Sequence, residues 1–372
     1  MSSSSSISSI SSISSISSIS SISSISSISS ISSIAMLPGY SGVMGNPLLT
    51  EALYTSRDGT LRDQELPPVS ELRDGWPSSG IATRLANWSP EVRINLALSE
   101  LLGSVHFSHD DQNHVSTLTH VRDRNGKLKR IGLVSMTRPE EAVFAAQLAL
   151  VGAWAEPHRK DRTAEVLAQV VPPVSFLAAV IGLHPDRQPR TFELLEVGLR
   201  FTYAVAMRFK DALRVPRPVD HSPLIQPMLL TPGHGALPAG HAAESHMAAT
   251  LLSRVLSLPA PSSRRTQLRR LARRIGENRV VAGLHFPIDN IAGKLLGDVL
   301  ANYLCALATE TAATSVDGGA FLLPAGDAHA QPALDADTLA QDEPGCSAIE
   351  DVSLQADLPC LRALFHSATR EW

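Results

Sequence analysis

The sequence predicts an all-α protein: a helical bundle with one small β-hairpin excursion and disordered termini. Between residues 137 and 308 apolar residues recur at three- and four-residue spacings, as in Leu194, Val197 and Phe201, which is the period of an amphipathic helix. Helix-start signals such as Ser89-Pro90-Glu91 precede these stretches. The 372 residues are 44% hydrophobic, enough for a sizeable core.

The first 89 residues form two segments without a helical pattern. Residues 1–36 are a leader of Ser-Ser-Ile triplets, whose three-residue period matches neither a helix nor a strand, so we expect disorder. Uncharged isoleucine repeats can also stack as β-structure, which leaves an adhesive tail as the alternative. Met36 ends the leader and offers an alternative start. Residues 37–89 are rich in Pro, Gly and Ser and favour an extended lead-in.

Residues 90–309 form the predicted helical domain, because the apolar period of a helix continues through most of it. Two β-branched stretches interrupt it and flank Asn125-Gly126, a strong hairpin signal that predicts strands over 115–121 and 128–134. Pro172-Pro173 breaks one helix. The predicted helices cover residues 90–102, 137–155, 161–183 with that break, 191–213, 242–256, 263–281 and 288–307.

Residues 310–372 form the predicted acidic, flexible tail. Between Thr311 and Leu361 there is no Lys or Arg, while Asp and Glu recur among Ala, Gly and Pro. Such a composition is typical of flexible segments. We expect a short terminal helix over 361–365.

Charge and cysteine content exclude several classes of protein. The net charge of −4 gives no global attraction to nucleic acid, and the arginine-rich stretch 263–274 lacks interleaved aromatic residues, so we expect a solvated helix face there. Cys305, Cys346 and Cys360 are odd in number and have no metal-ligand spacing, which argues against a disulfide framework or a zinc site. With no apolar run of membrane-spanning length and no signal peptide, we expect a soluble, cytoplasmic protein.

Two short stretches of the helical domain hold groups that suit a tetrahedral oxyanion. Lys210 and Arg217 lie seven residues apart at a predicted helix end, and Pro218 follows; on one helix that spacing places both on one side. Pro238-Ala239-Gly240-His241 directly precedes another predicted helix. There the glycine lets the backbone approach a ligand, the first-turn N–H groups point at an anion, and a histidine can transfer a proton.

A third stretch adds a cation and an oriented histidine. Arg279 offers a planar guanidinium for phosphate-like oxygens. His285 follows six residues later and Asp289 four after that, the helical spacing at which a carboxylate can hold one ring nitrogen and aim the other. A neutral histidine held in this way can attack phosphorus or ligate a metal.

In order and internal spacing, the three stretches resemble the signature of the type 2 phosphatidic acid phosphatase and vanadium-dependent haloperoxidase superfamily: KxxxxxxRP, PSGH and SRxxxxxHxxxD. The matching residues are Lys210, Arg217, Pro218, Pro238, Gly240, His241, Arg279, His285 and Asp289. Two positions depart from the signature, because Ala239 and Asn278 stand where it has serine. The resemblance covers residues 161–307 and implies an all-α bundle with the oxyanion site at its centre.

The resemblance also implies a role for each residue. Lys210, Arg217 and Arg279 would hold the oxyanion oxygens, with the Gly240 backbone N–H as a further donor. His285, oriented by Asp289, would be the nucleophile toward phosphate or the axial ligand to vanadate. His241 would be the general acid–base on the opposite side. His234 and Ala239 would lie on the halide side, since a second histidine seven residues before His241 is similar to that of bromoperoxidases.

Three functions are compatible with these residues. The first is a soluble haloperoxidase that uses bound vanadate and hydrogen peroxide to oxidise halide. The second is a phosphomonoesterase that needs no cofactor and acts on a phosphate ester through a phosphohistidine at His285. The third is a non-catalytic phosphate- or vanadate-binding relative, which Ala239 keeps open by removing a hydroxyl donor. Homo-oligomerisation stays open, and we expect neither a nucleic-acid partner nor a transmembrane segment.

Overall fold

The computed structural model describes residues 47–61, 80–124, 127–171, 174–309, 314–333, 338–354 and 356–372. The leader of residues 1–36, predicted to be disordered, lies outside them. The chain divides into two units, Met1–Arg84 and Leu85–Trp372. In the lead-in, predicted to be extended, helices α3 (Pro47–Leu61) and α4 (Ile81–Ala86) form instead. Pro47 suits the first turn of a helix, and a run of good helix formers follows it.

The second unit is mostly helical, as predicted. The helix α6 joins two predicted helices and runs through Pro157; one backbone hydrogen bond is lost there, while α6 packs along α11. Short 3-10 turns cover Pro223–Ile225, Ala325–Asp327 and Ala340–Asp342. The helices are α5 (Pro90–Gly103), α6 (Glu141–Ala168), α7 (Val174–Ile181), α8 (Pro189–Leu213), α9 (Pro218–His221), α10 (Gly240–Val255), α11 (Ser263–Val281), α12 (Pro287–Thr309) and α13 (Pro359–Thr369).

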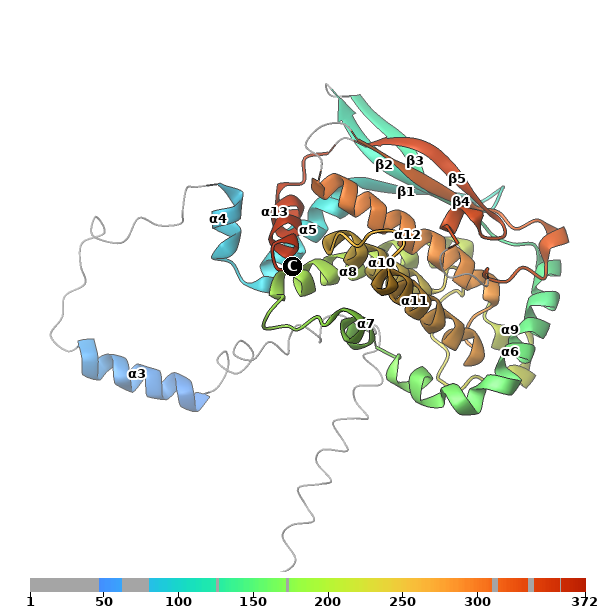
Figure 1. Ribbon diagram of the computed structural model, residues 1–372, viewed down its shortest axis with the longest axis horizontal. Coiled ribbons are helices and arrows are strands. Elements are labelled where there is room, and N and C mark those ends of the chain that lie inside the picture. Colours follow the sequence, from blue (N-terminus) through green and yellow to red (C-terminus); the bar gives the residue numbers. More distant parts are fainter. Residues whose placement is uncertain are drawn as a thin grey trace, which may run out of the picture. The chain divides into compact units, whose positions relative to one another are not determined.

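Helix α10 lies inside the helical layer and packs against α8, α11 and α12 (Figure 1). Its contact with α12 is close because Gly293 presents no side chain. A Cβ atom there would lie 2.6 Å from the Ala239 carbonyl oxygen and 2.8 Å from the Ala242 Cβ. In addition, the Ala239 N–H donates to the Asp289 carbonyl oxygen at 2.8 Å. The start of α10 is thereby fixed against the start of α12.

A five-stranded mixed sheet lies beside the helical layer, over α12 (Figure 1). The all-α prediction is therefore wrong in this respect, although most of the described chain is helical. The strands, in sheet order, are β1 (Val105–Asp110), β2 (Val115–Arg124), β3 (Lys127–Thr137), β4 (Thr314–Phe321) and β5 (Cys346–Leu354). Neighbours pair antiparallel except β3 and β4, which are parallel.

The predicted hairpin is confirmed, since β2 and β3 pair antiparallel with Arg124 opposite Lys127. Asn125 and Gly126, which carried the prediction, lie outside the described residues. The sheet is larger than an excursion because β4 and β5 extend it from the far end of the chain.

The prediction that residues 310–372 form a flexible tail is wrong for their described part, which contains β4, β5 and α13. Helix α13 packs on α5 and α8 and buries Leu361 and Leu364. Composition misled the prediction because the segment takes its polar partners from the helical domain. The Lys294 side chain pairs with Glu343, and both Glu100 carboxylate oxygens cap the start of α13 at 2.9 Å.

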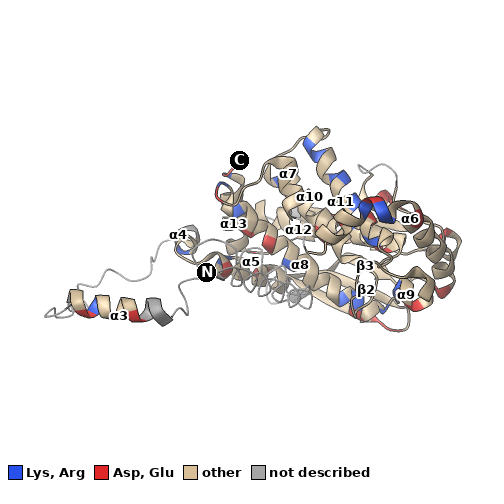
Figure 2. Cartoon of the chain, turned by 90° about the horizontal axis from the view of Figure 1, so that it is seen from below, with Lys and Arg blue, Asp and Glu red and all other residues tan. Residues whose placement is uncertain are grey.

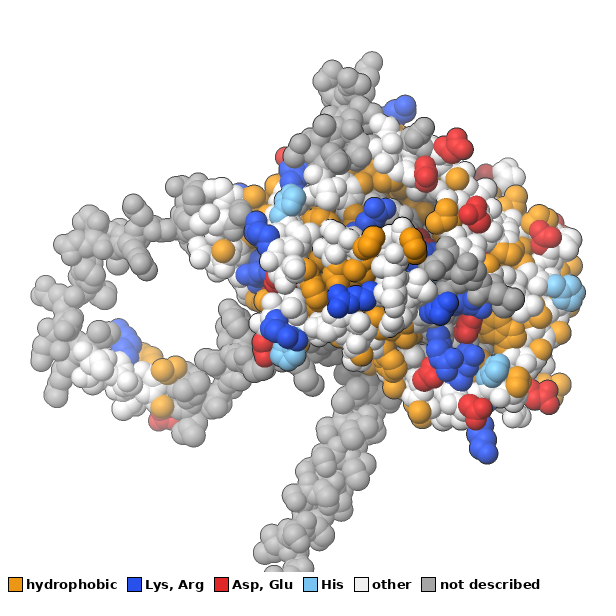
Figure 3. Space-filling model, viewed as in Figure 1, with side chains coloured by type: hydrophobic (Ala, Val, Ile, Leu, Met, Phe, Trp, Pro, Cys, Tyr) orange, Lys and Arg blue, Asp and Glu red, His pale blue; other side chains and the backbone are white. Residues whose placement is uncertain are grey.

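The surface carries charges of both signs. The arginines of α11 form blue bands in Figure 2, and on the face shown in Figure 3 basic side chains alternate with acidic and hydrophobic ones. Among the described residues, α12 is the one helix long and apolar enough to cross a membrane, and 89% of its apolar window is buried inside the protein. The three cysteines are free.

Candidate functional site

Helix ends bring the three signature stretches together. Lys210 lies in the last turn of α8, His241 in the first turn of α10 and Arg279 in the last turn of α11. His285 lies two residues before the start of α12 (Pro287), and Asp289 lies in the first turn of that helix. Arg217 is the N-cap of α9. We call these six residues the oxyanion cluster: Lys210, Arg217, His241, Arg279, His285 and Asp289.

Electrostatic interactions connect the members of the cluster. Lys210 interacts with Arg217 and Asp289, and His241 interacts with Arg279 and Lys210. The side chains of Lys210, Arg217, Arg279 and Asp289 are buried, and that of His241 is half-buried. Residues up to 79 positions apart in the sequence, Lys210 and Asp289, therefore share one desolvated site.

His285 is held between a carboxylate and a guanidinium. Its Nδ1 lies 3.0 Å from Asp289 Oδ2, and that oxygen also accepts from the Phe286 N–H at 2.9 Å. Its Nε2 lies 3.0 Å from Arg217 Nη1. Since a guanidinium can only donate, Nε2 carries the lone pair and Nδ1 carries the proton. This is the tautomer that an Nε2 nucleophile or ligand requires.

Burial controls the protonation of this pair. It lowers the pKa of His285 well below the ordinary value, and the charges of Arg217 and Lys210 lower it further. Burial also raises the pKa of Asp289 to about 6, against the Phe286 N–H, Lys210 and Arg217, which lower it. Near pH 7 the imidazole is therefore neutral and the carboxylate is ionised.

The cations of α8 and α9 bond to backbone carbonyls. Lys210 Nζ donates to the oxygens of Gly235 at 3.0 Å and Ala236 at 2.9 Å. Arg217 Nε donates to the His234 oxygen at 3.0 Å, and Nη1 donates to the Leu284 oxygen at 2.9 Å. Neutral carbonyls satisfy the hydrogen bonds of these cations but do not cancel their charge.

Arg279 is less completely satisfied. Its Nη2 donates to the Val166 oxygen at 2.9 Å, while its Nε is buried without a hydrogen-bond partner. Within the described part of the chain, no side-chain ion pair joins Lys210, Arg217 or Arg279 to a carboxylate. Burial lowers the pKa of both arginines to about 10. Burial and the charge of Arg217 lower the pKa of Lys210 well below its ordinary value. A bound anion would relieve this charge surplus.

His241 faces the cluster in the opposite tautomer. Its Nε2 lies 2.9 Å from the Gln169 carbonyl oxygen, so Nε2 donates and Nδ1 carries the lone pair. Burial, helped by the charge of Arg279, lowers the pKa of His241 to about 3. Near pH 7 the ring is therefore neutral, and its Nδ1 is unprotonated.

The remaining predicted residues lie at the edge of the cluster. His234 Nδ1 is 3.0 Å from Arg217 Nη2, and burial together with Lys210 lowers the pKa of His234 to about 4. Ala239 is the buried N-cap of α10 and provides no side-chain hydrogen bond, so the hydroxyl of the signature serine is missing. Gly240 begins α10. Asn278, the other departure, points to the end of α6, where its Nδ2 donates to Gln169 Oε1 at 2.9 Å.

Glu244 was not among the predicted site residues. It lies on α10 three residues after His241, half-buried, and interacts electrostatically with Lys210. Burial raises the pKa of Glu244 to about 7. The three-residue spacing from His241 was a signal for it, since residues at that spacing share a helix face.

Vanadate fits this set of donors. Vanadate needs one nitrogen ligand with a lone pair and cationic donors for its oxygens. The cluster offers His285 Nε2 as the nitrogen and three buried cations as donors. One of these cations, Arg279, has an Nε without a hydrogen-bond partner. Among the described residues, no group of three or more His, Cys, Asp or Glu side chains could hold a metal cation. No known family model matches the chain, and no curated protein matches it.

Proposed function

We propose that the oxyanion cluster binds a tetrahedral oxyanion, and that the protein is an enzyme of the vanadium-dependent haloperoxidase type. The observation that supports this proposal is the charge surplus. Lys210 and Arg217 act on His285 and Arg279 acts on His241, none of the three has a carboxylate ion pair among the described residues, and His285 Nε2 carries a lone pair. Bound vanadate would supply the Lewis acid that activates hydrogen peroxide toward halide.

The residues of the chain prepare the site for that chemistry. Asp289 holds the His285 Nδ1 proton and so keeps Nε2 available. Arg217, which now donates to that Nε2, must exchange the imidazole for an oxyanion oxygen when the site fills. Lys210 and Arg279 compensate the remaining negative charge, and burial strengthens each of these interactions. His241 can accept a proton at Nδ1.

A phosphomonoesterase is the second candidate, because the same nitrogen can attack phosphorus. A bond would form between His285 Nε2 and phosphorus while the ester P–O bond breaks, and the leaving alkoxide would take a proton from a neighbouring acid. Water would then hydrolyse the phosphohistidine. This reaction also asks mainly for positioning and for charge stabilisation on the equatorial oxygens.

One preparation of the full chain separates the candidates. Bromination of an organic acceptor would be measured with vanadate, bromide and hydrogen peroxide, and phosphate-ester hydrolysis would be measured without vanadate. Vanadate-dependent bromination that His285→Ala abolishes supports the first candidate, and hydrolysis alone supports the second.

The matched control is His246→Ala, because His246 is also a buried histidine of the second unit but lies outside the oxyanion cluster. It should retain activity. Binding of vanadate without turnover would favour a binding protein, and the absence of both binding and turnover would contradict the proposal.

A further inference from the structure

The C-terminal end of α6 holds two members of the oxyanion cluster. The Val166 carbonyl oxygen accepts from Arg279 Nη2, and the Gln169 carbonyl oxygen accepts from His241 Nε2, both at 2.9 Å. Gln169 is the C-cap residue of α6. The last carbonyls of a helix lack partners within the helix and carry its negative dipole end, so they suit a guanidinium and an imidazole N–H.

Asn278 fixes this helix end to α11. Its side chain is fully buried, and its Nδ2 donates to Gln169 Oε1 at 2.9 Å and to Glu165 Oε2 at 3.0 Å. Glu165 in turn forms an ion pair with Arg274 at 2.6 Å. The amide therefore uses both of its protons on residues of the end of α6.

The type of residue at this position matters. The signature that the sequence resembles has serine where this chain has Asn278, and a serine hydroxyl has a single proton. Serine could satisfy Gln169 or Glu165, but not both. The pair of hydrogen bonds therefore requires asparagine rather than serine. Asn278 directly precedes Arg279 on α11.

We propose that Asn278 is a positioning residue, which holds the end of α6 so that the Gln169 carbonyl keeps the proton of His241 on Nε2 and leaves Nδ1 unprotonated. The importance of this tautomer for turnover rests on the proposed function. The hydrogen bond itself does not, so it can be tested without any activity.

The test observes the His241 Nε2–H directly, in proton–nitrogen NMR spectra of the full chain labelled with ¹⁵N-histidine. In the wild type this proton should exchange slowly with water, because the Gln169 carbonyl holds it at 2.9 Å on a half-buried ring. In Asn278→Ala, exchange should be at least about ten-fold faster. Asn278→Ser should give an intermediate rate, and it serves as the folded variant if the alanine variant does not fold.

Asn290→Ala is the matched control. Asn290 is also a buried asparagine directly beside a cluster residue, but neither its Oδ1 nor its Nδ2 has a hydrogen-bond partner. It should leave the exchange of His241 unchanged. Equal protection in the wild type and both Asn278 variants, or equal loss in Asn290→Ala, would overturn the proposal.

Activity provides the second readout. If the enzyme assays succeed, Asn278→Ala should lower kcat about 10- to 100-fold with little change in KM, whereas a merely structural residue would change the amount of folded protein instead. If no activity is found but the exchange result holds, the proposed function fails and the positioning role stands. If the wild-type proton is unprotected, the positioning role fails whatever the activity.

Discussion

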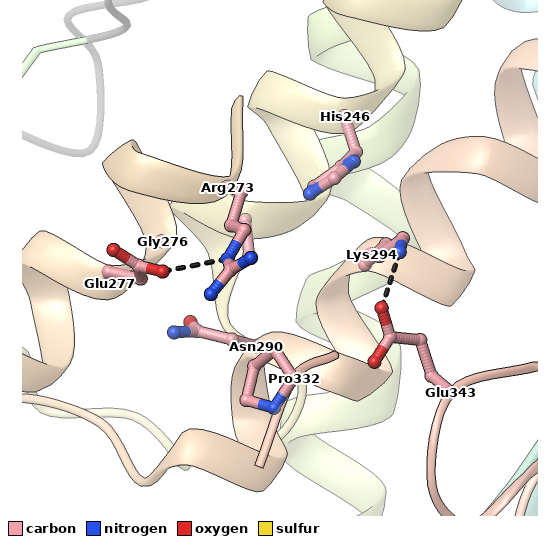
Figure 4. Close-up of a pocket in the computed structure, with 9 residues that line it drawn as sticks. His246, Arg273, Gly276, Glu277, Asn290, Lys294, Pro332 and Glu343 are labelled. Atoms are coloured by element: carbon pink, nitrogen blue, oxygen red, sulfur yellow. Dashed lines mark hydrogen bonds and ion pairs between the residues drawn. The ribbon is translucent and has the colours of Figure 1, made fainter. Parts of the chain in front are cut away.

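Two polar clusters share the helices α10, α11 and α12, and they differ in how their charges are paired. The second cluster surrounds a cavity lined by Ala242, His246, Arg273, Gly276, Glu277, Asn290, Lys294, Pro332 and Glu343 (Figure 4). There Arg273 Nε lies 2.7 Å from Glu277 Oε1, and Lys294 pairs with Glu343. In the oxyanion cluster, the described cations bond to carbonyls and to histidines instead.

From this difference we interpret the second cluster as structural and the oxyanion cluster as the proposed binding site. The cavity of the second cluster measures about 20 Å³, room for about one water molecule. Both cations of its lining are paired with carboxylates, and Glu277 also pairs with Arg162 at 3.2 Å. It needs no external charge. The oxyanion cluster has three buried cationic side chains, and the carboxylates that interact with Lys210 are Asp289 and the half-buried Glu244. We propose that an external anion completes it.

The largest contrast is expected between two arginines of α11. Arg279→Gln removes an unpaired cation and should lower kcat/KM or the affinity for vanadate by about 10²–10³-fold, about 2.7–4 kcal/mol. Arg273→Gln removes a paired one and should change either quantity less than about two-fold. Isothermal titration with vanadate and steady-state kinetics measure both. Equal losses in the two variants would remove the distinction between the clusters.

Stability should show the reverse contrast. Glu343→Gln leaves the buried Lys294 without its carboxylate and should lower the free energy of unfolding by about 3 kcal/mol. The affinity for vanadate should stay the same in the folded fraction. Urea unfolding followed by circular dichroism measures the first quantity. An unchanged midpoint would show that the paired cluster contributes no stability.

Both clusters contain neutral histidines, which should make the fold acid-sensitive. Burial lowers the pKa of His241 to about 3 and those of His234 and His246 to about 4. An unfolded histidine titrates near 6.5, so between pH 6.5 and about 4 the unfolded chain binds more protons. Stability from these groups is complete above pH 6.5 and falls below it by up to about 1.4 kcal/mol per pH unit for each of His241 and His246. The fall from His234 should be smaller, because this side chain is exposed and solvent screens its charge.

His246→Gln tests this effect in the second cluster alone. It should reduce the slope of unfolding free energy against pH by about one proton between pH 6 and 4.5. Urea titrations at several pH values measure the slope. An unchanged slope would mean that His246 is protonated in the folded protein.

Glu244 should give the smallest effect, with the opposite sign. Burial raises its pKa from the ordinary 4.5 to about 7, so the folded protein binds the extra proton and stability falls as the pH rises from 4.5 to 7. Glu244→Gln should remove this fall and stabilise the protein at pH 8 by about 1 kcal/mol, since the side chain is only half-buried. Thermal unfolding at pH 5 and pH 8 compares the variants. A variant less stable than the wild type at pH 8 would contradict this assignment.

Local patterns in the sequence predicted the helices well and the long-range pairings poorly. The helix α11 covers the predicted residues 263–281, and α8 begins two residues earlier than predicted. The strand β4 was missed because its partner β3 lies more than 170 residues earlier, and no local period records such a pairing. The strand β5 was missed with it, because β5 joins the sheet by pairing with β4. The buried partners of the acidic segment are also distant in the sequence, since Lys294 lies 49 residues before Glu343.

In the candidate site, too, local contacts could be predicted from the sequence and long-range contacts could not. Spacing predicted the contact between His285 and Asp289, because four residues make one helical turn. It could not predict that Arg217 donates to His285, or that Gln169 holds His241, because these contacts depend on how helices pack. The signature order alone indicated that the three stretches belong together.

Titration of the full chain with vanadate, and in parallel with inorganic phosphate, tests the anion requirement of the oxyanion cluster most directly. One oxyanion should bind per chain, with raised thermal stability, and Arg279→Gln should abolish binding while Arg273→Gln retains it. Failure of the folded wild type to bind either ion, or binding that survives Arg279→Gln undiminished, would contradict the account.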